Sequence, residues 1–433
     1  MFKKFPELIE NAETISYIGK IENIVGMCME SSGSRASIGD IAMIYNEETH
    51  KQIPVEVVGF KNDKIQLMAY DNISGVSVGS FVRNTKHRLK IPVGESLRGR
   101  IIDATGKPID SLGAFESSRH YYVDNTYINP LDRPPITDTL DFGVKAIDGL
   151  NTVGKGQRIG IFAGSGVGKS TLLGMIAKNV KADINVIALV GERGREVREF
   201  VEKDLGEEGL KRSVLVVATS DQPAMLRMKC PLVATTIAEY FKDQGKDVLL
   251  MMDSLTRFAM AQREIGLAIG EPPVARGYTP SIYAEFPKLL ERSGNFKEGS
   301  ITGVYTVLVE GDDTNEPVAD TVRGILDGHI VLSRKLANEN HFPAIDVNAS
   351  ISRLMSNIVD EEHKAAASAL RDILSIYAKN EDLISIGAYK AGSNPKLDFA
   401  ISKINQVNAF LMQKVDEHFT KEEILEMMKQ ILA

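Results

Sequence analysis

The segment Ala163–Thr171, with the sequence AGSGVGKST, constrains this chain more than any other. It lies between an apolar run, Arg158–Phe162, and a helical pattern that begins near Lys169, so it joins a buried strand to a helix. Closely spaced glycines let successive backbone N–H groups turn toward one anion, and the helix N-terminus adds partial positive charge. The segment therefore predicts an α/β domain whose P-loop binds a nucleoside triphosphate.

The residues expected to bind ATP follow from this pattern. Lys169 would reach the β- and γ-phosphates, and the Ser170 hydroxyl would be a ligand for Mg²⁺. Ala163 stands where the strict pattern has its first glycine, a small departure that leaves the loop possible. A glycine-rich turn that binds nothing is the alternative, which the flanking strand and helix disfavour. The expected contact residues are Gly164, Ser165, Gly166, Val167, Gly168, Lys169, Ser170 and Thr171.

The chain is expected to contain several domains, because 433 residues exceed what one hydrophobic core usually organises. Residues 1–90 carry short alternating apolar segments such as Ile41–Ile44 and Ile65–Met68, which are typical of a small β-barrel or sandwich. Residues 91–350 are expected to form a second domain, in which apolar strands alternate with helical patterns from about residue 155; this indicates a mainly parallel sheet covered on both faces. Residues 351–433 are predicted to form a helical domain. The expected strands of the sheet are Arg158–Phe162, Asn185–Val190, Ser213–Ala218, Asp247–Met252, Thr302–Val309 and His329–Leu332.

The composition is that of an ordinary globular protein, with 43% apolar and 25% charged residues. The formal net charge of -7 provides no general attraction to the phosphate backbone of a nucleic acid. No apolar run approaches the roughly 20 residues of a membrane span, and the first residues lack a signal-peptide pattern, so a cytoplasmic location is expected. Cys28 and Cys230 are too few for a disulfide framework and are expected to be buried thiols.

Two acidic positions are candidates for the chemistry of hydrolysis. Asp253 ends an apolar run and would support the Mg²⁺ together with Ser170. Glu192 comes just after another predicted strand, and residues at the carboxyl ends of parallel strands face the ligand crevice. Glu192 is therefore favoured as the group that polarises the attacking water. Glu196, one turn further on, is the rival candidate, although it fits a solvated charged surface equally well.

These motifs resemble those of the ATPase of the flagellar and type III secretion export apparatus, a family similar to the catalytic subunit of rotary ATP synthases. The resemblance spans nearly the whole chain. Besides the P-loop, it rests on Pro92–Arg100, Gly191–Val197, Asp253–Ala259, Glu271–Tyr278, His341–Val347 and Ser350–Arg353. It implies a β-barrel, a RecA-like nucleotide domain and a helical domain. It also implies a homohexameric ring that hydrolyses ATP to energise protein export, most closely in the flagellar form.

The resemblance gives roles to several further residues. Arg193 and Arg257 would lie near the phosphates. Arg353 matches the arginine finger, a cation supplied across a subunit boundary, although by itself it would be an ordinary surface residue. Phe342 matches the aromatic residue that stacks on adenine, and Tyr389 is a second candidate for a wall of that pocket. Ordinary core packing is the alternative for both aromatic residues.

The resemblance also implies partners. The loop at about Gly270–Pro280 matches a segment that faces the central channel of the ring, where a central stalk protein or an export substrate with its chaperone would bind. The apolar residues within Phe2–Ile9 would form a helix face for the regulatory protein of the family, or else belong to a frayed terminus. Members of the family associate peripherally with the membrane export gate, at the inner face of the membrane.

Three alternatives stay open at this point. The catalytic subunit of a rotary synthase has the same fold, but its acidic rotor-binding segment has no clear match in Asp360–Lys364. An RNA-translocating hexameric ATPase also joins a small β-domain to this core. The RNA-translocase alternative is disfavoured because the chain is acidic overall and has no cluster of aromatic and basic residues near the N-terminus. A non-catalytic nucleotide-binding subunit is disfavoured because Glu192 and Arg353 are both present.

Overall fold

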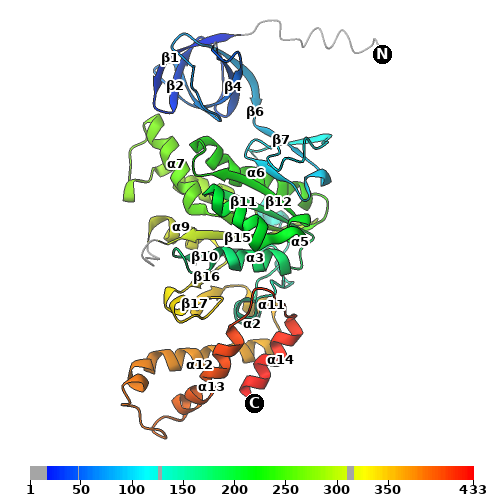
Figure 1. The fold of residues 1–433 in the computed structure, drawn as a ribbon, viewed down its shortest axis with the longest axis vertical. Helices are drawn as coiled ribbons and strands as arrows, with labels where there is room; N and C mark the ends of the chain where they lie inside the picture. Colours follow the sequence, from blue (N-terminus) through cyan, green and yellow to red (C-terminus); the bar gives the residue numbers. More distant parts are fainter. Residues whose placement is uncertain (1–16, 47, 125–128, 310–315) are drawn as a thin grey trace.

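The computed structural model describes residues 17–46, 48–124, 129–309 and 316–433. The chain forms three parts stacked along its long axis: a barrel near the N-terminus, a central α/β part, and a helical part that contains the C-terminus (Figure 1). This confirms the predicted fold class. The predicted divisions at residues 90 and 350 stay predictions, and the proposed regulatory segment Phe2–Ile9 lies outside the described residues.

The barrel consists of β1 (Ile18–Val25), β2 (Cys28–Ser32), β3 (Asp40–Tyr45), β4 (Gln52–Lys61), β5 (Lys64–Ala69) and β6 (Phe81–Arg88). Its strands are antiparallel and close in the order β1-β2-β5-β4-β3-β6. Alternate side chains fill the interior. Ala42 and Ile44 of β3 are buried in the barrel core, whereas Met43 between them is partly exposed. The alternation seen in the sequence therefore reports the inward face of this strand.

The central part is built on one large sheet in the order β17-β16-β10-β15-β13-β11-β12-β8, with β14 pairing on β15. Neighbours in this order are parallel, except that β17 is antiparallel to β16. The six predicted strands are confirmed, and each predicted end lies within two residues of the observed end. The strands are β8 (Ile101–Asp103), β10 (Arg158–Ala163), β11 (Ile184–Glu192), β12 (Ser213–Thr219), β13 (Asp247–Asp253), β14 (Gly294–Asn295), β15 (Ser300–Leu308), β16 (Gly328–Leu332) and β17 (Ile345–Ser352). A separate antiparallel pair is formed by β7 (Lys90–Val93) and β9 (Arg119–Tyr122).

Helices cover both faces of this sheet, which explains why its inner strands are largely apolar. In β11, Val186 and Ala188 belong to the core on one face, while Ile187 and Leu189 belong to the core on the other. The first face packs against α6 and α7, and the second core also contains residues of α2 and α3. The helices of this part are α2 (Lys145–Leu150), α3 (Lys169–Asn179), α4 (Gly194–Glu199), α5 (Gly206–Lys211), α6 (Ala224–Lys242), α7 (Leu255–Ile269), α8 (Pro280–Leu290), α9 (Pro317–Ile325) and α10 (Arg334–Asn338).

The helical part contains α11 (Met355–Ile358), α12 (Glu361–Ser385), α13 (Pro395–Leu411) and α14 (Lys421–Leu432). Helices α12 and α13 lie side by side (Figure 1), and the segment after α13 contacts the central part again through a hydrogen bond from Gln413 to the carbonyl oxygen of Gly143. Cys28 and Cys230 are both buried free thiols, as predicted. Among the helices of the described residues, none combines the length and apolar character that a bilayer span requires.

Candidate functional site

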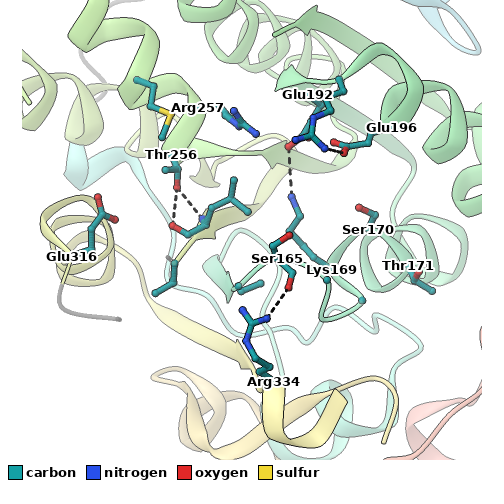
Figure 2. Close-up of a pocket in the computed structure, with 18 of the residues that line it drawn as sticks. Ser165, Lys169, Ser170, Thr171, Glu192, Glu196, Thr256, Arg257, Glu316 and Arg334 are labelled. Carbon is teal, nitrogen blue, oxygen red and sulfur yellow. Dashed lines mark hydrogen bonds and ion pairs between the residues drawn. The ribbon is translucent and has the colours of Figure 1, made fainter. Parts of the chain in front are cut away.

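The predicted P-loop lies at the carboxyl end of β10 and leads directly into α3 (Figure 2). Gly166 and Gly168 have φ values of 79° and 87°, the left-handed region that glycine enters without strain. The loop borders a cavity of about 820 Å³ that is also lined by the ends of β11 and β15. Of the predicted contact residues, Val167 is the exception: its side chain is buried in the core and does not line the cavity.

Lys169 lies between two carboxylates. Its ammonium forms an ion pair with Asp253 and is 3.8 Å from Glu192 Oε1. Thr306 donates a hydrogen bond of 2.7 Å to Asp253 Oδ1, which fixes this carboxylate at the end of β13. The side chains of the lysine and both acids are at most 12% exposed, so their mutual attraction is weakly screened by water. The structure thus brings together the P-loop lysine and both predicted acidic residues.

Glu192 and Glu196 differ in their surroundings. Burial and the nearby Asp253 carboxylate raise the pKa of Glu192 to about 7, although Lys169 opposes this shift. A hydrogen bond between the two glutamates lowers the pKa of Glu196. Glu196 is also exposed and accepts a hydrogen bond of 3.0 Å from Arg193 (Figure 2). Glu192 therefore lies inside the cavity, whereas Glu196 and Arg193 form its solvated rim.

Arginine side chains surround the remainder of the cavity. Arg257, in the first turn of α7, has a buried Nε without a hydrogen-bond partner among the described residues. A buried donor of this kind fits an anionic ligand. Arg334 donates a hydrogen bond of 3.4 Å to the carbonyl oxygen of Ser165 (Figure 2), and Arg263 and Arg276 also line the cavity. These last three arginines were not predicted, because nothing in their spacing relates them to the P-loop.

A second cavity of about 610 Å³ adjoins the P-loop and shares Gly168 and Thr171 with the first. Phe342 lines it, and a Cβ atom on Gly168 would lie 3.5 Å from the Phe342 ring. The ring is 40% exposed, so it is available to stack on a planar ligand. The remaining lining residues are mostly apolar and include Leu172, Met175, Pro343, Met412 and Val415.

The predicted place of Tyr389 is corrected by the structure. Within the described residues, Tyr389 lines neither cavity. Its hydroxyl lies 3.1 Å from the carbonyl oxygen of Asn394 and 3.0 Å from Asp398 Oδ1, in the connection between α12 and α13. The long helix α12 carries this residue away from the P-loop. The wall that it was expected to form is supplied by residues 412–417, which follow α13.

Arg353 lies near the amino ends of the parallel strands, whereas the P-loop lies at their carboxyl ends. Its backbone N–H donates a hydrogen bond of 3.0 Å to the carbonyl oxygen of Asp327, just before β16. The Asp327 carboxylate in turn accepts a hydrogen bond of 3.0 Å from the backbone N–H of Arg158, the first residue of β10. The P-loop follows the last residue of the same strand. At a rise of about 3.3 Å per residue, roughly 16 Å of strand separates the two ends.

The structure offers few ligands for a metal ion. Ser170 lies exposed in the first turn of α3, and the Asp253 carboxylate lies beside Lys169. In the part of the chain that the structure describes, no three His, Cys, Asp or Glu side chains are grouped as a metal cluster. Mg²⁺ usually takes only one or two protein oxygens and completes its shell with phosphates and water. Ser170 and Asp253 therefore fit an ion that enters with a nucleotide.

Comparisons with known proteins agree with this geometry. Residues 21–86 and 143–352 match the beta-barrel and nucleotide-binding domains of the ATP synthase alpha/beta family, and residues 359–430 match the T3SS EscN ATPase C-terminal domain. The flagellum-specific ATP synthase of Bacillus subtilis is 56% identical over 418 residues, which are 96% of this chain and 95% of that protein. The type 3 secretion system ATPase of Xanthomonas euvesicatoria is 47% identical over 95% of this chain and 93% of its own length.

Solved structures give the same result. The assembled ATPase EscN of the enteropathogenic E. coli type III secretion system superposes with a TM-score of 0.91 at 47% identity, over 96% of this chain and all of that one. EscN in complex with its central stalk EscO superposes with a TM-score of 0.88. The likeness includes barrel, nucleotide domain and helical part together. The chain therefore belongs to the family of flagellar and type III secretion ATPases, and it is an ATPase.

Proposed function

We propose that this ATPase works as a homohexameric ring that hydrolyses MgATP at its subunit boundaries and energises protein export through a flagellar apparatus. One observation supports the proposal most directly. Each chain has a complete phosphate cavity and, near the amino ends of the parallel strands, the exposed Arg353, which its own cavity cannot use. The assembled form of EscN supports a ring, and the names of several relatives support the flagellar role. The EscN-type C-terminal domain disfavours a rotary synthase subunit and an RNA translocase.

In this proposal, the P-loop binds the triphosphate and Lys169 moves from the carboxylates toward the β- and γ-phosphates. The backbone N–H groups at the start of α3 would hold the phosphate oxygens. Ser170 and Asp253 would hold Mg²⁺, which when bound neutralises negative charge on the phosphates. Arg257 would give its unpartnered Nε–H to the same anion, and Arg193 would approach from the rim.

Glu192 is the proposed group that orients and deprotonates the attacking water. It lies in the cavity, and its pKa of about 7 suits a base that works near neutral pH. Glu196 is the less favoured candidate because it is exposed and already paired with Arg193. The second cavity would hold the adenine ring against Phe342, next to the P-loop that holds the phosphates.

Arg353 is proposed to serve the cavity of a neighbouring subunit. Roughly 16 Å of β10 separates its anchor from its own P-loop, which is further than an arginine side chain extends. In a ring, the exposed Arg353 would face the next subunit and supply a cation to the phosphoryl group during transfer. The donor and the recipient are then copies of one chain.

The proposed partners follow the relatives. A central stalk protein would bind the exposed loop at about 270–280, as the complex of EscN with its central stalk supports. Export substrates, their chaperones and the membrane export gate would contact the ring on the cytoplasmic side of the membrane. The regulatory protein would bind the segment Phe2–Ile9.

Mixed rings test the central part of this proposal. Arg353→Ala should leave ATP binding nearly intact but lower turnover by roughly 10³- to 10⁵-fold, or about 4 to 7 kcal/mol of transition-state stabilisation. Lys379→Ala, which removes an exposed cation from α12, is the control and should keep normal turnover. Mixing Arg353→Ala with Lys169→Ala subunits should restore part of the activity, because some boundaries then join an intact loop to an intact arginine. Absence of recovery, in rings that light scattering shows to be assembled and that contain both variants, would refute action across the boundary.

A further inference from the structure

One side chain, Gln413, connects three segments around the second cavity. Its backbone N–H donates a hydrogen bond of 3.0 Å to the carbonyl oxygen of Phe342. Its side-chain Oε1 accepts a hydrogen bond of 2.9 Å from the backbone N–H of Lys145. Its Nε2 donates to the carbonyl oxygens of Gly143, at 2.8 Å, and Glu417, at 3.0 Å. The residue is 6% exposed, so these bonds compete little with water.

The segment that Gln413 holds lacks regular structure of its own. Residues 412–419 form neither helix nor strand, so no helix or sheet ladder fixes their position. Five of them line the second cavity: Met412, Gln413, Lys414, Val415 and Glu417. The position of this wall therefore depends on the single backbone bond to Phe342 and on side-chain contacts to the rest of the protein.

The turn at residues 142–144, which Gln413 contacts, is held by a buried carboxylate. The buried Asp148 carboxylate accepts backbone hydrogen bonds from Phe142 at 2.9 Å, Gly143 at 2.6 Å and Val144 at 3.2 Å. This fixes the turn before α2 that supplies the partners of Gln413. The Lys145 ammonium also lies 4.7 Å from the centre of the Phe419 ring, which adds a cation–π contact to the same segment. Gln413 is thus the hydrogen-bonded link between a fixed turn and an otherwise irregular wall.

We propose that Gln413 is the positioning residue of the base-binding cavity: it sets the wall formed by residues 412–417 against Phe342 and so determines how tightly the base is held. The proposal rests on the proposed function, in which this cavity receives adenine. Gln413 is itself part of the cavity wall, and its side-chain amide forms its hydrogen bonds with backbone groups, so it acts on the base by holding the wall in place. The phosphate contacts come from the P-loop and α3, which Gln413 does not touch through any of these bonds.

The test uses Gln413→Met, which keeps the side-chain volume and removes the side-chain hydrogen bonds. Gln406→Met, at an exposed position of α13, is the matched control. For Gln413→Met we expect the KM for ATP to rise about tenfold while kcat stays within about threefold, because the transferred phosphate keeps its contacts. Inhibition by tripolyphosphate, a ligand without a base, should stay within about twofold of the wild-type value. A variant that merely folds poorly would lower kcat through loss of active enzyme and leave the affinities for ATP and tripolyphosphate unchanged. That result would overturn the proposal.

Two further variants separate the possible failures. If Phe342→Ala leaves the preference for ATP over tripolyphosphate unchanged, the cavity does not bind the base and the proposed function of this site fails. If Phe342→Ala removes the preference but Gln413→Met retains it, only the role of Gln413 is overturned. Should Gln413→Met not fold, Gln413→Glu replaces it. This variant keeps the acceptor for Lys145 but sets a carboxylate oxygen against two carbonyl oxygens, so the same loss of ATP affinity is expected and a normal KM would refute the role.

Discussion

Exchange of Glu192 for glutamine tests the proposed general base with almost no change in shape. The pKa of this carboxyl is raised from 4.5 to about 7, so as a base it is stronger by about 3 kcal/mol at 1.36 kcal/mol per unit. Glutamine cannot accept the proton of the attacking water. Loss of a general base usually lowers turnover by roughly 10²- to 10⁴-fold, or about 3 to 5 kcal/mol of barrier. Glu192→Gln is expected within this range.

The affinity of Glu192→Gln for ATP should not fall together with its turnover. Lys169 lies 3.8 Å from Glu192 Oε1, so removal of this charge leaves Asp253 as the carboxylate that competes with the phosphates for the lysine. Equilibrium binding of a fluorescent ATP analogue should therefore be equal to or tighter than that of the wild type, while steady-state phosphate release falls. Glu196→Gln is the matched control, because it removes a carboxylate from the exposed rim. The assignment is refuted if Glu196→Gln loses turnover and Glu192→Gln does not.

Two other predictions concern Lys169 and the ion pair between Arg100 and Asp110. Lys169→Ala should abolish measurable ATP hydrolysis and weaken ATP binding, since the triphosphate loses its main cation; turnover near the wild-type rate would overturn the nucleotide site. Asp110 has a pKa lowered to about 2, chiefly by hydrogen bonds from Arg100, against an ordinary value of 3.8. Its stabilising contribution is therefore complete above about pH 4 and is lost as the pH falls from 4 to 2. Urea midpoints measured across this interval should fall less steeply for Asp110→Asn than for the wild type, and equal slopes would contradict the argument.

The sequence predicted most reliably those features that are encoded within one short segment. The P-loop can be recognised because strand, glycines, lysine and helix are consecutive, and the six predicted strands of the central sheet are mostly apolar runs. The two edge strands were missed for a physical reason. Strand β8 has three residues, and β17 carries exposed positions such as Asn348 and Ile351, so neither shows the pattern of a strand buried on both faces.

Parts of the site that come from distant segments were harder to predict. Thr306 holds Asp253 in place, but a threonine inside an apolar strand looks like any other β-branched residue until the neighbouring strand is known. Tyr389 was expected beside Phe342 because of the family resemblance, yet hydrogen bonds at the start of α13 hold its hydroxyl elsewhere. The wall is instead made by the irregular segment after α13, whose place depends on the bonds of Gln413. Where a site is closed by irregular backbone, its geometry is determined by partners far away in the sequence, and periodicity gives no signal for them.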